Sequence, residues 1–372
     1  MYRLVEVKTK REQKDFLDFP LKLYKGNPYF VPCLYGDEKK ILRGDWHLKY
    51  SKQAFYLVYD GKKVVGRIQA ILSRLSNEKQ NQKRVRFTRF DAIDDREVAK
   101  LLFGAVEQFA KDNGMDSVCG PLGYSDMDRE GLLIEGFNEL STFEEQYNYP
   151  YYQKLIEGLG YAKEVDWVER KLYAPKELDT RIGRIADAMM KRNGLKMAVC
   201  KSTKELVKRY GDAFFDLIDE TYKDLYMTVD FPEEERKEYI AAFKLLISPK
   251  YVRIIVDKDD KVVAIGLCFP SIGKALQKSG GKLTLPCLIK VMKAVKKPEI
   301  IDLGLIGILP KYQNSGVSWA IFYEIMKMLY EGGVAYCETN LNLEDNKGIQ
   351  NNWGRFENIL HKRRRSYLKK IA

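Results

Sequence analysis

The chain has 372 residues, about twice the size of a typical single domain, and 45% of them are hydrophobic while 31% are charged. This balance supports folded cores and excludes an intrinsically disordered protein. No stretch approaches the roughly 18 consecutive apolar residues of a membrane span, and charged residues begin too close to the N-terminus for a secretory signal. We therefore expect a soluble, cytoplasmic protein.

Cysteine and histidine usage excludes two further classes. The six cysteines lie far apart without a CxxC pair, and the only histidines are His47 and His361. Neither a zinc cluster nor a disulfide framework fits this pattern, so we predict no metal. Mechanisms that pair a histidine base with a serine or cysteine nucleophile are also disfavoured, because so few histidines are present.

The net charge of +12, from 64 basic and 52 acidic residues, favours an anionic partner. Nucleic acid, a phosphorylated cofactor and an anionic membrane surface all satisfy this condition. The segment HKRRRSYLKK (361–370) holds six of the basic residues and no acidic one. A solvated basic tail explains this segment equally well, so charge alone does not choose the partner.

The pattern of predicted elements occurs twice along the chain. Two β-rich runs surround the turn Asp60–Gly61 in residues 55–72, and residues 251–269 have the same form around Asp257–Asp260. Further on, a strand precedes a helix in both halves, at 86–93 and 97–112 and again at 300–309 and 317–330. We predict an α/β or α+β protein with domains at 1–175 and 196–372, joined by a helical connector at 176–195.

The segment from Leu303 to Gly333 carries the most chemical information. A nearly apolar strand runs into Pro310, and a polar loop, Gln313–Ser318, then opens a helix. Gly316 lacks a Cβ, so the backbone can approach a ligand there. The first N–H groups of a helix lack internal partners and lie at the positive end of its dipole, which suits a pyrophosphate. The other common phosphate loops, GxxxxGK[ST] and GxGxxG after a strand, are absent.

This loop resembles the coenzyme A loop of the GNAT acyltransferases, Q/R-x-x-G-x-G/A. Gln313 and Gly316 match the pattern, and Ser318 replaces its last small residue. The strand 335–340, Asn346 before the helix 347–360 and the closing basic run 362–370 follow in the order of that family. FPLKLYKGNPYFVP (19–32) and EGLLIEGFN (130–138) resemble bacterial proteins with two GNAT-like halves. The resemblance implies two tandem domains, each a mixed, mostly antiparallel sheet flanked by helices.

The resemblance also implies an acyl-CoA-dependent N-acyltransferase that uses acetyl-CoA or a longer acyl-CoA as co-substrate. Asp302, which lies 11 residues before Gln313, is one candidate general base and Glu338 is the other. Trp353 stands where the family usually has a tyrosine acid, so water or Tyr367 would have to replace it. Transferred residue by residue, the cofactor-binding set comprises the main chain at Ile306, Gly307 and Ile308 together with Gln313, Asn314, Ser315, Gly316, Val317, Ser318 and Asn346.

The first half resembles the same fold without a cofactor site. Its counterpart of the loop is Asp94-Asp95-Arg96-Glu97, whose carboxylates repel a pyrophosphate. The polar loop 123–130 and the tyrosine cluster 147–152 are the features expected of an acceptor pocket, and a surface loop with interface packing explains them equally well. The candidate substrate residues there are Tyr124, Glu130 and Tyr152.

An insert in the second half, LTLPCLIKVMKAVKK (283–297), predicts an amphipathic helix. Leu285, Leu288, Met292 and Val295 fall on one stripe, and lysines lie at 290, 293, 296 and 297. A core helix that bridges the two halves is one interpretation. The other is an interfacial helix, or a lid for a long-chain amine, with peripheral contact to an anionic membrane at its inner face.

Two other functions remain open from the sequence. Other two-domain GNAT enzymes transfer an aminoacyl group from tRNA, and a GNAT-like chain could also be a non-enzymatic scaffold with a nucleic-acid-binding tail. The loop QNSGVS favours coenzyme A over the tRNA-dependent enzyme. Nucleic acid is disfavoured because Tyr367 is the only aromatic residue in the basic tail. The acceptor amine, the acyl length and the oligomeric state stay undetermined.

Overall fold

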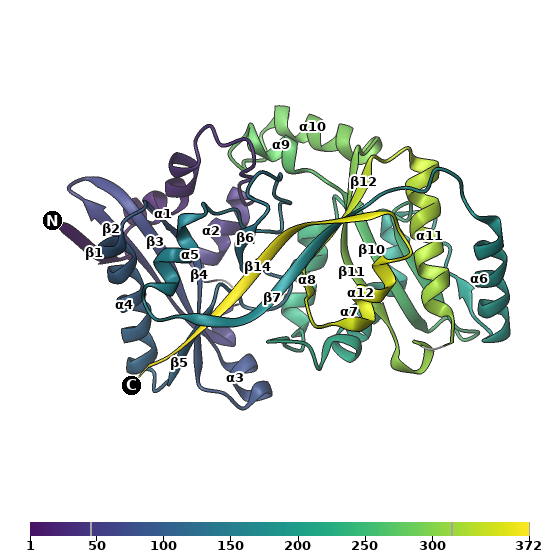
Figure 1. Cartoon of the computed structure of the whole chain (residues 1–372), viewed down its shortest axis with the longest axis horizontal. Helices are drawn as coiled ribbons and strands as arrows, with labels where there is room; N and C mark the ends of the chain where they lie inside the picture. The colour runs from purple at the N-terminus through teal and green to yellow at the C-terminus, as the bar shows by residue number, and fades with distance from the viewer. Residues whose placement is uncertain (45–46, 314, 372) are drawn as a thin grey trace. The chain divides into compact units, whose positions relative to one another are not determined.

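The computed structural model describes residues 1–44, 47–313 and 315–371 (Figure 1). The chain forms two compact units. Unit 1 comprises Met1–Val168, Ile272–Lys290 and His361–Ala372, and unit 2 comprises Glu169–Ser271 and Val291–Leu360. No helix in the described part of the chain combines the length and the apolarity needed to cross a lipid bilayer.

This division differs from the predicted domains 1–175 and 196–372. The predicted closing strand is strand β14 (Asn358–Lys370), and it pairs with unit 1, for example through Tyr367 opposite Gly120. The predicted connector is helix α6 (Thr180–Arg192), which belongs to unit 2. Strand pairing decides the first assignment and the packing of α6 against α11 decides the second, and the order of elements along the chain shows neither contact.

Unit 1 is a twisted sheet with helices on both faces. Strands β1 to β5 follow one another in the sheet, and β14 pairs with β5 and β6. Strands β4 and β5 are parallel, whereas β1–β2, β2–β3 and β3–β4 are antiparallel. The elements are β1 (Tyr2–Glu6), α1 (Lys10–Leu23), α2 (Tyr35–Arg43), β2 (Ser51–Asp60), β3 (Lys63–Ser73), α3 (Arg74–Gln80), β4 (Arg84–Ala92), α4 (Arg96–Asp112), β5 (Ser117–Gly120), β6 (Leu132–Glu135), α5 (Tyr151–Glu157) and α9 (Gly273–Gln277). Strand β7 (Ala162–Leu172) contributes residues to both units.

The two faces of the unit 1 sheet are covered by different helices. A Cβ at Gly66 would meet Val98 of α4, while the next residue of the strand, Arg67, donates to the carbonyl oxygen of Phe16 in α1. Successive residues of a strand point to opposite faces, so α4 and α1 lie on opposite sides of β3. The core between α4 and the sheet includes Val98, Leu102 and Phe103 of the helix and Ile68 and Phe87 of the strands.

Unit 2 repeats this plan. Its sheet has the order β8-β9-β10-β11-β12, and β12 also pairs with the C-terminal end of β7. Strands β11 and β12 are parallel, and β9–β10 and β10–β11 are antiparallel. The elements are α6, β8 (Lys196–Met197), α7 (Thr203–Tyr222), α8 (Glu233–Phe243), β9 (Val252–Val256), β10 (Val262–Pro270), β11 (Ile300–Ile308), α11 (Val317–Gly332), β12 (Tyr336–Thr339), β13 (Asn342–Leu343) and α12 (Lys347–Trp353); helix α10 (Leu285–Lys296) contributes residues to both units.

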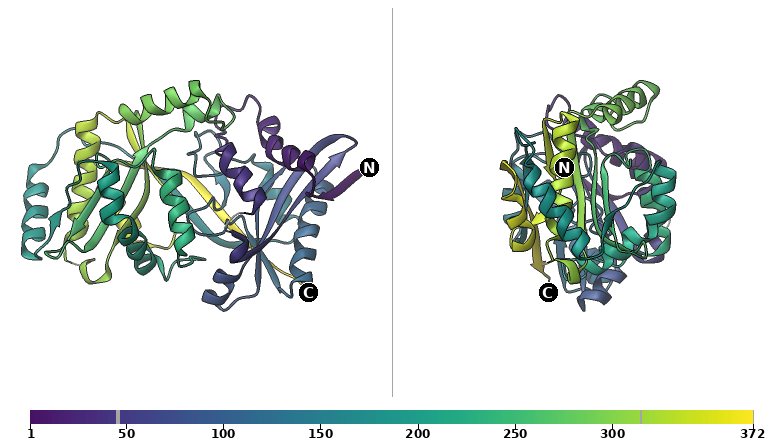
Figure 2. Two further views of the ribbon diagram at one scale, coloured as in Figure 1. Left: turned by 180° about the vertical axis from the view of Figure 1, so that it is seen from behind. Right: turned by 90° about the vertical axis from the view of Figure 1, so that its right-hand side faces the viewer.

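Glycines show how closely helices approach the unit 2 sheet. A Cβ at Gly266 would lie 3.4 Å from Ile325 of α11, and one at Gly307 would lie 3.0 Å from Thr221 of α7. Because Gly307 pairs with the neighbour of Gly266, these two helices cover opposite faces, as the rotated views in Figure 2 show. The glycines in β10 and β11 therefore let both helices pack tightly against the strands that carry the candidate site.

The two units confirm the repeat that the sequence predicts. Each contains an antiparallel hairpin, then a strand, a helix and a parallel strand: β4–α4–β5 in unit 1 and β11–α11–β12 in unit 2. The α/β class with mixed, mostly antiparallel sheets is also confirmed. The position of interest in each unit is the N-terminus of the helix between the two parallel strands.

Candidate active site

Strand β11 leaves its parallel neighbour halfway along its length. It pairs with β12 only from Ile300 opposite Tyr336 to Leu303 opposite Thr339, whereas its pairing with β10 continues to Ile308. On the β12 side, residues 304–308 have no strand partner among the described residues. The predicted main-chain site at Ile306, Gly307 and Ile308 lies in this part of the strand, so its backbone can offer N–H groups to a ligand.

A tyrosine hydroxyl already lies at this backbone. Tyr222, the last residue of α7, donates to the carbonyl oxygen of Ile306 over 3.1 Å, and the Ile306 N–H approaches the same hydroxyl at 3.4 Å. Tyr222 is half-buried. The sequence gives no signal for it, because 84 residues separate the two partners and the contact depends on how α7 packs on the sheet.

The N-terminus of α11 has no side-chain cap. Gly316 is the N-cap residue with φ 83°, and no described side chain accepts a hydrogen bond from the first turn. The hydroxyl of Ser315 donates instead to the carbonyl oxygen of Tyr312, and the amide of Gln313 donates to that of Ile308. The N–H groups at the start of α11, which include Val317 and Ser318, therefore remain available to an anion. The predicted residue Asn314 lies outside the described residues.

Helix α6 fixes the backbone of this loop. A Cβ at Gly316 would come within 3.0 Å of Met189 Cγ, and the positive φ also disfavours any other residue. The amide of Asn193 reaches the carbonyl oxygen of Ser315 at 3.5 Å. Gly183 of α6 lies against the ring of Tyr323 in α11. The segment predicted as a connector thus forms one wall of the candidate phosphate site.

The two candidate bases are neighbours. Asp302 on β11 and Glu338 on β12 are register partners in the parallel pair, so their side chains emerge on the same face of the sheet. Only 3% of Asp302 and 4% of Glu338 is exposed. They lie one residue before β11 separates from β12. The structure therefore brings both predicted carboxylates to the start of the open part of the strand.

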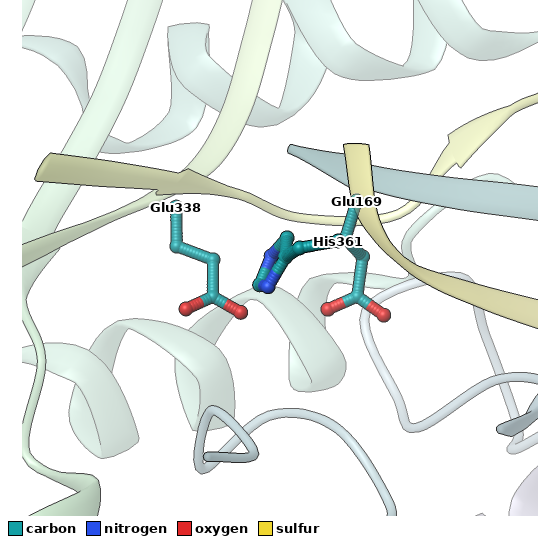
Figure 3. Close-up of side chains that lie close together, drawn as sticks. All are labelled: Glu169, Glu338 and His361. Carbon is teal, nitrogen blue, oxygen red and sulfur yellow. The ribbon is translucent and has the colours of Figure 1, made fainter. Parts of the chain in front are cut away.

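Glu338 has two further ionisable neighbours (Figure 3). One ligand atom each from Glu169, Glu338 and His361 lies within 4.8 Å of the others. Glu169 is fully buried on β7, and the side chain of His361 is 3% exposed on β14. Glu169 and Glu338 both belong to unit 2, and two buried carboxylates this close can share one proton. Glu338 is predicted from the sequence, whereas Glu169 is not, and His361 stands out there only as one of two histidines.

No family model matches the chain. It is 26% identical to protein YghO of Escherichia coli, over 98% of this chain and 94% of that protein. It is 25% identical to the bacterial ceramide synthase of Caulobacter vibrioides, over 93% of this chain and 91% of that protein. A solved tandem GNAT protein from the clavulanic acid biosynthesis pathway matches 100% of this chain and 98% of its own length, with a TM-score of 0.55 and 11% identity.

The chain has the tandem GNAT fold. The predicted resemblance is thereby confirmed for the architecture of both halves. Within this fold, the helix after the fourth strand of the sheet is α4 in unit 1 and α11 in unit 2, so the two helix N-termini can be compared directly.

In unit 1 the GNAT helix N-terminus is occupied by its own carboxylate. Asp95 is the N-cap of α4 and accepts from the N–H groups of Glu97 at 2.8 Å and Val98 at 3.2 Å. The hydroxyl of Tyr2 donates to the same carboxylate at 2.8 Å, and this hydrogen bond lowers the pKa of Asp95. A charged side chain therefore fills the place where unit 2 leaves N–H groups open.

Two residues that the GNAT resemblance singled out in the last helix have structural roles. The Asn346 side chain is the N-cap of α12 and accepts from the Ile349 N–H at 3.2 Å. Trp353 is 1% exposed, packs edge-on against Phe322, and donates its indole N–H to Asn342. Tyr367, the proposed substitute for the acid, is fully buried in unit 1, where its hydroxyl donates to Glu157.

The three candidate substrate residues in unit 1 are all buried. The Tyr124 hydroxyl contacts Gln53 and accepts from Gln69, and the Tyr152 hydroxyl accepts from the Ala92 N–H at 2.9 Å. Burial raises the pKa of Glu130 well above its usual range, and the nearby Asp126 raises it further. Tyr152 thus belongs to the hydrophobic core of unit 1, whereas Tyr124 and Glu130 are buried side chains of the polar loop 123–130.

A cavity in unit 1 lies beside these residues and is lined by their neighbours. Its empty volume is about 630 Å³, including the part open to solvent. From the polar loop it takes Gly123, Asp128 and Arg129, and from the tyrosine cluster it takes Tyr147. The sequence therefore identified the segments that line a cavity but not the side chains that face it, because the loop has no period from which to infer orientation.

Proposed function

We propose that the protein is an acyl-CoA-dependent N-acyltransferase whose unit 2 holds the thioester. The observation that carries this proposal is the uncapped N-terminus of α11 beside the open part of β11. Unit 1 has the same strand and helix, but Asp95 caps the helix there. A carboxylate at the phosphate position opposes an anion, so one acyl-CoA per chain is expected.

In this proposal, different residues of unit 2 carry out the separate steps of acyl transfer. The first-turn N–H groups of α11 receive the pyrophosphate, and the N–H groups of Ile306 and Ile308, which face away from β10, polarise the thioester carbonyl. Asp302 or Glu338 takes one proton from the substrate ammonium, and the resulting neutral amine bonds to the acyl carbon as the carbon–sulfur bond breaks. The nitrogen then loses its second proton to water. The Tyr222 hydroxyl donates a proton to the leaving thiolate, a role that the buried Trp353 cannot fill.

The acceptor we propose is a long-chain, lipid-like amine. The relative from Caulobacter vibrioides is named a ceramide synthase, and the similarity extends over 93% of this chain. An amine of this kind is delivered from a membrane surface, which agrees with the net charge of +12. Both the amine and the preferred acyl length are part of the proposal.

The direct test is an acyl-transfer assay that follows the release of free coenzyme A thiol. The purified chain is incubated with acetyl-CoA or palmitoyl-CoA and with either a sphingoid base or a short primary amine. We expect thiol release to require the long-chain amine, and the amide product to be found by mass spectrometry. Transfer to the short amine alone would overturn the lipid-like acceptor, and no amide with any pair would overturn the enzyme.

A further inference from the structure

Helix α10 exposes an apolar stripe. Leu285, Ile289 and Met292 have 72%, 63% and 53% of their surface exposed. At about 100° per residue these three side chains fall within roughly 60° of the helix circumference. Leu283, immediately before the helix, is 47% exposed and lengthens the stripe. Surface helices of folded proteins normally turn such residues inward, so a stripe of this length indicates an interaction surface.

The opposite side of the same helix is packed. Cys287 and Val291 are 2% and 0% exposed, and the thiol of Cys287 contacts the carbonyl oxygen of Ala275 in α9. Of the predicted stripe, Leu288 and Val295 are half-buried, whereas Leu285 and Met292 face outward. The interpretation of α10 as a core helix is therefore wrong for its outer face. In Figure 2 the light-green α10 lies at the margin of the ribbon.

The stripe lies in a strongly basic segment. Residues 273–298 contain seven lysines and no aspartate or glutamate, and all seven lysines are exposed. Within α10 these are Lys290, Lys293 and Lys296, and none of the three forms an ion pair in the described part of the chain. On the helical wheel Lys293 and Lys290 flank the apolar stripe on one side, and Lys296 lies at its C-terminal end.

We propose that α10 and the preceding loop dock on an anionic lipid bilayer, with Leu285, Ile289 and Met292 at the boundary between headgroups and acyl chains. The flanking lysines would then meet lipid phosphates. A nucleic acid would satisfy the lysines but leave the apolar stripe in water, and the helix has no aromatic side chain on which bases could stack. A second copy of the chain would bring two sets of lysines together, which repel one another.

This surface is independent of the acyl-transfer proposal, and its test uses vesicle binding instead of activity. The full chain is sedimented with vesicles of phosphatidylcholine, and with vesicles in which a third of that lipid is replaced by phosphatidylglycerol. We expect binding to the anionic vesicles only, with a loss of binding as salt is raised. Absence of binding to anionic vesicles at low salt would overturn the proposal.

Two variants and their matched controls separate the stripe from the charge. Ile289→Glu should lower the partition coefficient about tenfold or more, because it places a charge where an apolar side chain is buried. Replacing Lys290, Lys293 and Lys296 by glutamine should lower it by about fivefold per lysine. The controls are Ile185→Glu, at an exposed isoleucine of α6, and glutamine at the exposed Lys62, Lys63 and Lys258.

The control variants should bind vesicles like the unaltered chain. Equal losses in the variants and their controls would show that general charge, not α10, drives binding. Loss of a concentration-dependent dimer in Ile289→Glu, without vesicle binding by the unaltered chain, would assign the stripe to a second copy. Circular dichroism and the affinity for acyl-CoA should stay unchanged in Ile289→Glu, so that unfolding and failure of the acyl-CoA site are each recognised separately.

Discussion

At the scale of single residues, the two units differ in the residue that caps one helix, α4 in unit 1 and α11 in unit 2. Gly316 has no side chain to cap α11, whereas the Asp95 carboxylate receives two N–H groups of α4. The same helix terminus is thus open in one unit and filled in the other. The same contrast is visible in the sequence, where Asp94-Asp95-Arg96-Glu97 is the counterpart of the loop Gln313–Ser318 in the second half. The structure identifies Asp95 as the residue whose carboxylate caps α4.

Tyr222 is the residue for which a substitution is most informative. Tyr222→Phe removes the hydroxyl that contacts the main chain of Ile306. If this hydroxyl protonates the leaving thiolate, kcat should fall by about 10² or more, since a positioned acid contributes roughly that factor. Acyl-CoA affinity, which depends on the N-terminus of α11, should change less than threefold.

The measurement is a full kinetic comparison with Tyr330→Phe as control, because Tyr330 is an exposed tyrosine on α11. A loss of acyl-CoA affinity equal to the loss of kcat in Tyr222→Phe would show that the hydroxyl only supports the strand. An unchanged kcat would remove it from the mechanism altogether.

At the scale of elements, the loop before α11 contacts α6, a helix that the sequence predicts as a connector. Gly183 of α6 lies against Tyr323 of α11, and a Cβ at Gly183 would come within 2.5 Å of that ring. Gly183→Ala must therefore move α6 or the ring, and Met189 on the same helix contacts Gly316. We expect a several-fold loss of acyl-CoA affinity, measured by calorimetry.

Gly104→Ala is the matched control for this variant. Gly104 lies in the middle of α4 in unit 1, and a Cβ there would meet no atom within 4 Å. This substitution should leave acyl-CoA affinity unchanged and stabilise the helix slightly, by about 0.5–1 kcal/mol. Equal affinities in the two variants would show that α6 does not hold the loop.

Local elements could be predicted from the sequence, whereas the pairing of distant strands could not. Hairpins, the two strand–helix–strand units and the polar loop before α11 were predicted, because local periodicity and turn residues encode them. The separation of β11 from β12 was not predicted, because it depends on which strand pairs with each edge of β11. For the same reason the sequence placed β14 in the second half, whereas its partners, β5 and β6, belong to unit 1 and lie far away in the sequence.

At the scale of the whole molecule, the two units share one plan and differ at the N-terminus of one helix, α4 in unit 1 and α11 in unit 2. The sequence predicted the cofactor loop and both carboxylates, Asp302 and Glu338, and the structure places these two side by side. Glu169 and Tyr222 of unit 2 were not predicted, because each lies in a segment distant from β11 in the sequence and neither belongs to a local motif. A repeat therefore predicts architecture better than it predicts which side chains meet.

The most direct test of this account is the number of acyl-CoA molecules bound per chain, measured by calorimetric titration. We expect one site, lost in Ser318→Asp and retained in Ser318→Asn. An acidic residue in the first turn stabilises a helix, by about 0.3–1 kcal/mol, so Ser318→Asp should fold while it repels the pyrophosphate. Two sites per chain, or full affinity in Ser318→Asp, would contradict the assignment of the thioester to the open helix of unit 2.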